Sequence, residues 1–206
     1  MARFVKIFFM QNQNSESRPL KQLAGKNIVL GVCGSIAVYK AAELASLLVR
    51  GGANVRAVMT ESAAKLMSPR IFQTLTRNDV SVCMWKEVES WKPEHISLAD
   101  FADALLVAPA TANTIANFAN GLAGDTLACV YLATKAPVLV APAMNSNMYS
   151  HPAVQANIET LRKRGVRFVQ PDCGRLACGA EGVGRLADPA EIARRTAELF
   201  GSGEKI

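Results

Sequence analysis

The chain of 206 residues has few of the side chains on which metal sites and disulfide frameworks depend. It contains two histidines and five cysteines, and the cysteines are odd in number and widely spaced, so we expect free thiols and a reducing, cytoplasmic environment. Cys173 and Cys178 lack the spacing and the partners of a zinc site, so no metal is expected. Only 19% of the residues are charged while 50% are hydrophobic, which excludes a disordered chain.

Long apolar runs and basic clusters are also missing. The apolar stretch at residues 4–10 is interrupted by Lys6, is too short to span a membrane, and precedes no small-residue cleavage site. The formal net charge of +6 favours an anionic ligand, but no run of Lys and Arg is interleaved with aromatics. We therefore expect a small-molecule ligand and neither nucleic-acid nor membrane binding.

The chain shows neither internal repeats nor an interior linker, and this predicts one domain. The polar segment from Gln11 to Pro19 indicates a flexible leader over residues 1–24, with ordered structure beginning near Lys26. The domain is expected over residues 25–200, followed by a short tail at 201–206.

Short β-branched or apolar runs alternate with helical patterns along this domain. Such alternation predicts a single doubly wound, Rossmann-like parallel sheet with helices on both faces. The expected strands are Asn27–Val32, Asn54–Met59, Ala104–Ala108, Val138–Ala141 and a short Phe168–Val169. The expected helices include Ser35–Arg50, Pro152–Arg164 and Pro189–Leu199.

Ligands of such sheets gather at the carboxyl ends of the strands, where the first loop here is Gly31–Ala37. Gly34 permits close backbone approach, and Ser35 can cap a helix whose free N–H groups favour a phosphate. The loop is not a dinucleotide fingerprint, because its glycine spacing is wrong and the second strand does not end in an acid. A phosphate site and an ordinary tight turn both remain open for this loop.

Three further loops follow predicted strands and carry polar groups in unusual number. Thr60 and Ser62 can bind a phosphate or simply cap the next helix. The segment 108–114 offers Thr, Asn and Thr together, which exceeds what one cap needs and suits a flat polar ring or a phosphate tail. The segment 141–149 combines two prolines, two methionines and two asparagines, and the amide N–H groups of Asn145 can hold a carboxylate.

Two single residues complete the set. His95 opens an expected helix, and a lone histidine is either structural or an acid–base group. His151, which precedes a proline, is expected to be an ordinary cap. Cys178 lies among glycines in a segment whose composition indicates a mobile flap.

Together these segments resemble the flavin-containing cysteine decarboxylases. The resemblance runs from about Leu23 to Leu199. It rests on the motifs Gly34-Ser35-Ile36-Ala37, His95-Ile96-x-Leu98, Pro109-Ala110-Thr111-Ala112-Asn113-Thr114, Pro142-x-Met144-Asn145-x-x-Met148 and Ala177-Cys178-Gly179. Tyr149 stands where the family often has Trp, and the stretch from Trp85 to Trp91 has no counterpart.

The resemblance implies a flavodoxin-like flavoprotein with FMN as cofactor. Within the family the pattern is most similar to members that decarboxylate 4'-phosphopantothenoylcysteine to 4'-phosphopantetheine in coenzyme A biosynthesis. The flavin transiently oxidises the substrate thiol, the resulting C=S group accepts the electrons of the departing carboxylate, and the ene-thiolate is then reduced, so that the reaction is redox-neutral overall. The family also implies a homotrimer or a dodecamer of trimers, and a functional pairing with a phosphopantothenate–cysteine ligase. Since no such domain follows Ile206, we expect a stand-alone enzyme or an excised domain.

The resemblance also implies residue roles. His95 is the base of the oxidation and decarboxylation half, Asn145 fixes the carboxylate, and Cys178 donates the final proton. Met148 and Ala177 contact the substrate beside Asn145. The residues expected to contact FMN are Gly34, Ser35, Ile36, Ala37, Thr60, Ser62, Thr111, Ala112, Asn113, Thr114 and Ala143.

Three other interpretations share parts of this pattern. A peptidyl-cysteine decarboxylase would share the fold, FMN, His95 and Asn145 but accept a peptide under its flap. A flavin prenyltransferase has the architecture but lacks the Pro-x-Met-Asn segment. A non-enzymatic regulatory subunit that inhibits a phosphatase would carry a long acidic tail, which residues 201–206 do not form.

Overall fold

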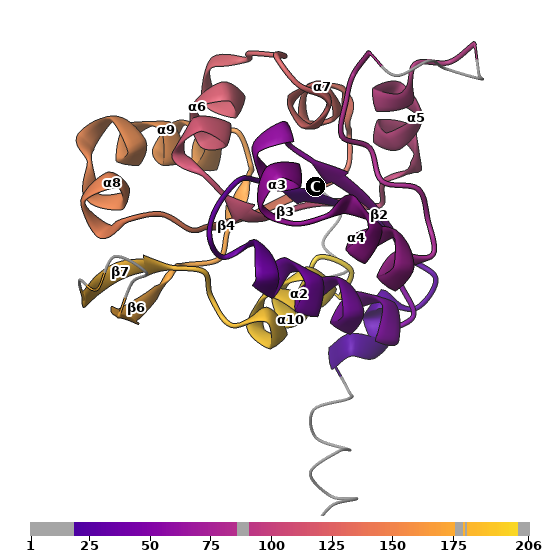
Figure 1. Cartoon of the computed structure of the whole chain (residues 1–206), viewed down its shortest axis with the longest axis horizontal. Helices are drawn as coiled ribbons and strands as arrows, with labels where there is room; N and C mark the ends of the chain where they lie inside the picture. Colours follow the sequence, from indigo (N-terminus) through magenta and orange to yellow (C-terminus); the bar gives the residue numbers. More distant parts are fainter. Residues whose placement is uncertain (1–18, 86–90, 176–178, 180, 202–206) are drawn as a thin grey trace, which may run out of the picture.

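The computed structural model describes residues 19–85, 91–175, 179 and 181–201. Its centre is a five-stranded parallel sheet in the order β2-β1-β3-β4-β5 (Figure 1), which confirms the predicted fold class. The strands are β1 (Asn27–Val32), β2 (Asn54–Met59), β3 (Ala104–Ala110), β4 (Val138–Pro142) and β5 (Arg167–Phe168). The strand order reverses direction between β1 and β3, and this point is where such sheets bind ligands.

Helices cover both faces of the sheet because its central strands are apolar on both sides. Alternate side chains of β1 and β3 enter two separate cores, one under α2 and α10 and the other under α6, α7 and α9 (Figure 1). The helices are η1 (Pro19–Leu23), α2 (Val38–Arg50), α3 (Glu61–Leu66), α4 (Pro69–Thr76), α5 (Glu94–Phe101), α6 (Ala112–Asn120), α7 (Thr126–Ala133), α8 (Ser146–Ser150), α9 (Pro152–Lys163) and α10 (Pro189–Glu198). Among the described residues, no helix is both long and apolar enough to cross a bilayer.

Several boundaries differ from the predicted ones. The short helix η1 lies ahead of the expected start near Lys26, and its fully buried Leu23 packs against the domain. Helix α2 begins at Val38 rather than Ser35, because a turn in which the Val38 N–H donates to Ser35 O takes up the preceding residues. The last strand of the parallel sheet is Arg167–Phe168 rather than Phe168–Val169.

A second sheet was not predicted. Strands β6 (Asp172–Arg175) and β7 (Glu181–Arg185) pair antiparallel beside α8, where the glycine-rich sequence predicted only a flap. Their glycines, which disfavour a strand by composition, permit close packing on the neighbouring loop. The fold is therefore a doubly wound sheet with an added hairpin at one end.

Candidate cofactor and substrate site

The carboxyl ends of the three strands at the switch point are joined by direct hydrogen bonds. The Cys33 N–H, just after β1, donates to Pro109 O in β3 at 3.2 Å, and the Thr60 N–H, just after β2, donates to Val32 O at 3.0 Å. The Thr114 hydroxyl donates to the Cys33 sulfur at 3.2 Å. Three loops far apart in the sequence thus form one continuous surface.

This surface encloses a cavity of about 520 Å³, a volume typical of small-molecule sites. Seven of the residues predicted to contact a cofactor line it, together with Met148, which was predicted to contact the substrate. The seven are Gly34, Thr60, Ser62, Thr111, Ala112, Asn113 and Thr114. The structure therefore brings together the first three of the four predicted strand-end loops, and the fourth contributes Met148.

The walls of the cavity are shaped by helix starts. Thr60 accepts a hydrogen bond from the Ala63 N–H and caps α3, and Thr111 accepts one from the Thr114 N–H and caps α6. A Cβ atom on Gly34 would lie 2.4 Å from the Ser62 Cβ, so only glycine allows the first two loops to approach this closely. The first N–H groups of a helix have no partner within it, and they attract anions.

Cys33 is fully buried directly after β1, where its sulfur accepts from the cavity-lining Thr114. Burial raises the pKa of its thiol to about 11, and the hydrogen bond from Thr114 lowers it by less. The charge of Asp125 adds to the increase. The thiol is therefore neutral at physiological pH and serves packing rather than nucleophilic chemistry.

Four of the residues predicted to contact the cofactor do not line the cavity. Ser35 does not cap α2 by its side chain; Ala37 is the N-cap residue, and the Ser35 hydroxyl only accepts from the Ala37 N–H at 3.4 Å. Ile36 is 64% exposed on the same turn, so the turn stands at the rim. Ala143 is buried in the core, and its N–H donates to Ala110 O across the sheet edge.

Part of the wall was missed by the sequence analysis. The segment Val82–Trp85 and the segment Gly124–Thr126 both line the cavity, as does Glu61. An isolated bridge between Val58 and Ser81 carries the first of these segments to the site, and nothing in the local sequence signals that pairing. The second has a recognisable signal, since Asp125 precedes an apolar helix and caps it by accepting from the Ala128 N–H at 2.7 Å.

The predicted carboxylate-binding residue Asn145 lies after β4 and caps α8, where its side-chain oxygen accepts from the Asn147 N–H at 2.9 Å. The hairpin of β6 and β7 packs against this loop, because the Met144 N–H donates to Gly184 O at 2.9 Å. A Cβ atom on Gly184 would lie 2.2 Å from Met144 O. The glycine in the hairpin thus fixes the distance between the hairpin and the Asn145 loop.

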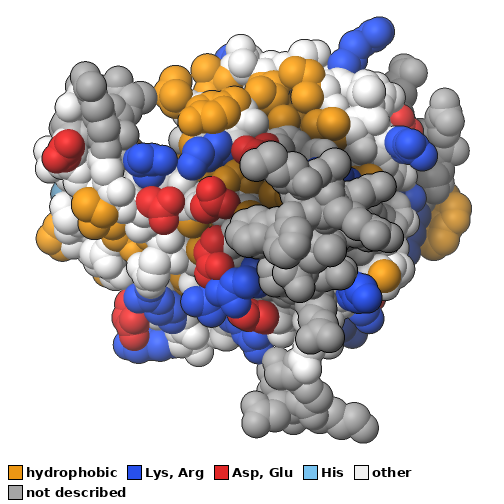
Figure 2. All heavy atoms as spheres, turned by 90° about the horizontal axis from the view of Figure 1, so that it is seen from below, with side chains coloured by type: hydrophobic (Ala, Val, Ile, Leu, Met, Phe, Trp, Pro, Cys, Tyr) orange, Lys and Arg blue, Asp and Glu red, His pale blue; other side chains and the backbone are white. Residues whose placement is uncertain are grey.

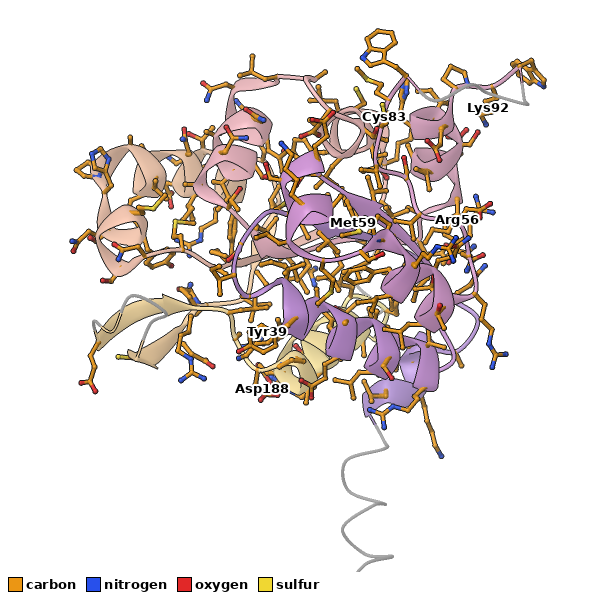
Figure 3. All side chains as sticks on the ribbon, in the orientation of Figure 1. Tyr39, Arg56, Met59, Cys83, Lys92 and Asp188 are labelled. Carbon is orange, nitrogen blue, oxygen red and sulfur yellow. The ribbon has the colours of Figure 1, made fainter. Side chains whose placement is uncertain are left out.

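His95 lies in the first turn of α5, which confirms the predicted helix start, and its side chain is half-buried. The Ser81 hydroxyl donates to the Glu94 carboxylate at 2.8 Å and ties this turn to the segment that follows β2. Helix α5 lies at the opposite side of the molecule from α8 and the hairpin (Figure 1). Cys83, on the missed wall segment, lies on the α5 side as well (Figure 3). The structure therefore does not bring His95 and Asn145 together within one chain.

The predicted flap residues Ala177 and Cys178 fall between the end of β6 at Arg175 and the start of β7 at Glu181, outside the described residues. His151 caps α9 by accepting from the Ala153 N–H at 3.2 Å, as expected for an ordinary cap.

The residues described include no cluster of three or more metal-ligating side chains. On the face shown in Figure 2, basic and acidic side chains are interspersed.

The fold and the cavity define a doubly wound α/β protein that binds a ligand at its switch point. The model of the Flavoprotein family matches residues 16–201, so the chain belongs to that family, which has FMN-binding members. The chain is 49% identical over 178 residues to the coenzyme A biosynthesis bifunctional protein CoaBC of Bacillus subtilis (strain 168), covering 86% of this chain and 44% of the relative. It is 45% identical over 170 residues to the CoaBC protein of Escherichia coli (strain K12), covering 82% and 42%. The chain thus spans less than half the length of these relatives.

Solved structures agree with this assignment. A PPC decarboxylase mutant complexed with pantothenoylaminoethenethiol matches with a TM-score of 0.78 and 29% identity over 86% of this chain and all of that chain. The FMN-dependent cysteine decarboxylase SpaF matches with a TM-score of 0.72 and 34% identity over 85% and 99%.

Proposed function

We propose that this protein binds FMN in the switch-point cavity and decarboxylates 4'-phosphopantothenoylcysteine to 4'-phosphopantetheine, a step of coenzyme A biosynthesis. The observation that carries the proposal is the cavity itself, whose walls are the loops at Gly34, Thr60 and Thr111–Thr114. The similarity to CoaBC proteins and to the complexed PPC decarboxylase supports the choice of substrate. The free thiols described at Cys33, Cys83, Cys129 and Cys173 support a cytoplasmic location.

The donors present fit a flavin mononucleotide. The start of α6 offers unpaired backbone N–H groups for a phosphate, and the exposed Asn113 in its first turn offers an amide. The acids Glu61 and Asp125 line other parts of the wall, which disfavours a second phosphate there and so favours FMN over a dinucleotide. A bound flavin supplies the reversible two-electron oxidation of the substrate thiol.

The residues of the chain then have three tasks. Asn145 orients the carboxylate, to which its amide N–H groups donate, while its side-chain oxygen accepts from the Asn147 N–H. His95 accepts the proton of the substrate thiol. Cys178 returns a proton to the ene-thiolate, with Met148 and Ala177 against the pantothenoyl chain.

These tasks require more than one copy of the chain, because α5 and α8 are on opposite sides of the domain. We therefore propose a homotrimer, or a dodecamer of trimers, in which His95 of one copy approaches Asn145 and the cavity of another. The exposed Trp85 and Met148 on the cavity wall are the apolar contacts expected at such an interface. A phosphopantothenate–cysteine ligase, whether fused or separate, would supply the substrate.

The test uses the purified protein as isolated. The protein should be yellow, release FMN rather than FAD on denaturation, and convert phosphopantothenoylcysteine to a product lighter by one CO₂. A peptide with a C-terminal cysteine is the matched control substrate and should remain unchanged. A colourless protein that FMN cannot reconstitute, or turnover of the peptide alone, would overturn the proposal.

A further inference from the structure

One buried hydroxyl in the described part of the chain differs from all the others. Thr126 is 2% exposed, and its Oγ1 is the single buried side-chain nitrogen or oxygen atom there that has no hydrogen-bond partner. The other buried polar side chains are all bonded: Thr76 to Phe72 O, Ser81 to Glu94, Thr114 to Cys33, and Thr196 to Ile192 O. A buried hydroxyl without a hydrogen bond lowers the stability of the fold, and buried polar groups in proteins are nearly always hydrogen-bonded. We therefore expect a partner for the Thr126 hydroxyl from outside the chain.

The location of Thr126 indicates where that partner comes from. Thr126 lines the cavity and is the first residue of α7, directly after the cap Asp125. The helix start is fixed in place, because Leu127 packs so closely on β1 that a Cβ on Gly31 would lie 2.5 Å from its Cδ1. Thr126 and the first N–H groups of α7 therefore belong to one wall of the site, and the unpaired hydroxyl lies just beneath its surface.

We propose that the Thr126 hydroxyl is a cofactor-binding group, which forms a hydrogen bond to a neutral polar atom of bound FMN. The neutral parts of FMN, its ring system and ribityl chain, are favoured over its phosphate because the Asp125 carboxylate is adjacent and would repel a dianion. The unpaired hydroxyl destabilises the empty protein, and cofactor binding removes that cost. This inference rests on the proposed function, in which FMN occupies this cavity.

The test compares Thr126→Val, which keeps the shape and removes the hydroxyl, with Thr126→Ser, which keeps the hydroxyl. For Thr126→Val the Tm of the FMN-free protein should be unchanged or raised, while the Kd for FMN should rise about five- to tenfold. Thr126→Ser should keep most of the affinity. Free FMN fluorescence, which is lost on binding, gives the Kd without any assay of turnover.

Thr196→Val is the matched control, because Thr196 is equally buried but its hydroxyl is bonded to Ile192 O at 2.8 Å and lies outside the cavity. It should leave the Kd for FMN unchanged and should not raise the Tm. A Kd for Thr126→Val within twofold of the wild type would overturn the inference, as would a lowered Tm of its FMN-free form, which would reveal a structural partner for the hydroxyl.

Failure of the proposed function gives a different result. Cys83 also lines the cavity and is exposed, so bound FMN should protect it from alkylation in the wild-type protein. Protection of Cys83 together with an unchanged Kd for Thr126→Val would overturn only the role of Thr126. Absence of protection would show that FMN binds elsewhere and would overturn both.

Discussion

The two ends of the sheet edge that carries the site are built differently. At the switch point, the loops after β1, β2 and β3 are hydrogen-bonded to each other and enclose a cavity within a single chain. At the other end, Asn145 lies between α8 and the added hairpin, while His95 lies on α5 across the molecule. One chain therefore forms the whole of the proposed cofactor cavity, whereas the residues proposed for the chemistry lie apart in it.

The largest effect is expected from His95→Asn. The variant should keep FMN but lose about 10²- to 10⁴-fold in decarboxylation, because the acid–base group is removed while the cavity is unchanged. Coupled product analysis by mass spectrometry measures the rate, and the visible spectrum measures bound FMN. Near-normal turnover would show that His95 is structural.

Mixing tests whether the site is shared between chains. His95→Asn and Asn145→Leu are each expected to be inactive alone. Unfolded and refolded together, they should recover part of the wild-type activity, because some interfaces then pair an intact His95 with an intact Asn145. Activity that never exceeds the sum of the two separate variants would place the whole reaction within one chain.

Cys178→Ser separates the two halves of the reaction. The variant should still lose CO₂ but stall before the final protonation, because a serine hydroxyl is a much weaker acid than a thiol with a free pKa of about 8.5. Mass spectrometry of one anaerobic turnover should find a product two hydrogens lighter than phosphopantetheine. A product of full mass would remove Cys178 from the proposed mechanism.

Gly184→Ala should lower turnover without changing the affinity for FMN. Its φ of +156° and the 2.2 Å approach of a Cβ to Met144 O require the hairpin to move away from the Asn145 loop. A displacement of this kind can cost about 10²-fold in turnover, while the FMN affinity should be unchanged. Gly121→Ala is the matched control: its φ is +68° but its Cβ would contact nothing within 4 Å, so it should cost only about 1 kcal/mol of stability. Equal effects of the two variants on turnover would contradict this account.

The smallest effect concerns pH and the surface of α10. Hydrogen bonds from Arg194 and Arg195 lower the pKa of Glu191 below its ordinary value. A carboxylate with a lowered folded-state pKa stabilises the fold at neutral pH, and this contribution is lost as pH falls through its titration. Glu191→Gln should therefore lower the Tm at pH 7 by an amount equivalent to less than about 1 kcal/mol, because the pair is exposed, and by less in acid. If Glu191→Gln and the wild type differed in Tm by the same amount at pH 7 and in acid, the proposed link between the pKa of Glu191 and stability would be refuted.

Most of the fold could be predicted from the sequence. Asn27–Val32 and Asn54–Met59 are strands at the predicted residues, because short β-branched runs between turn residues allow few alternatives. The loops after these strands and after β3 could be assigned to one site because parallel strands end at the same edge. Seven of the residues predicted for the cofactor line one cavity, and their contact with FMN remains a prediction.

The features of the fold and of the cavity that were not predicted depend on contacts between residues far apart in the sequence. The wall segment Val82–Trp85 reaches the cavity through a single bridge at Ser81, and the partner of that bridge lies more than twenty residues earlier in the chain. The hairpin of β6 and β7 was missed because glycines that disfavour strands by composition are required there for close packing. Thr126 was missed because an unpaired hydroxyl is a property of its surroundings and not of the residue type.

The buried thiol of Cys33 has a consequence for a protein whose proposed substrate is itself a thiol and passes through an oxidised form. A thiolate at this position would be a competing nucleophile, able to trap the oxidised substrate or to form mixed disulfides with it. With its pKa raised to about 11 and its sulfur accepting from Thr114, Cys33 stays protonated and out of reach. The site can thus process the sulfur of a substrate while the buried thiol that joins two of its loops remains chemically silent.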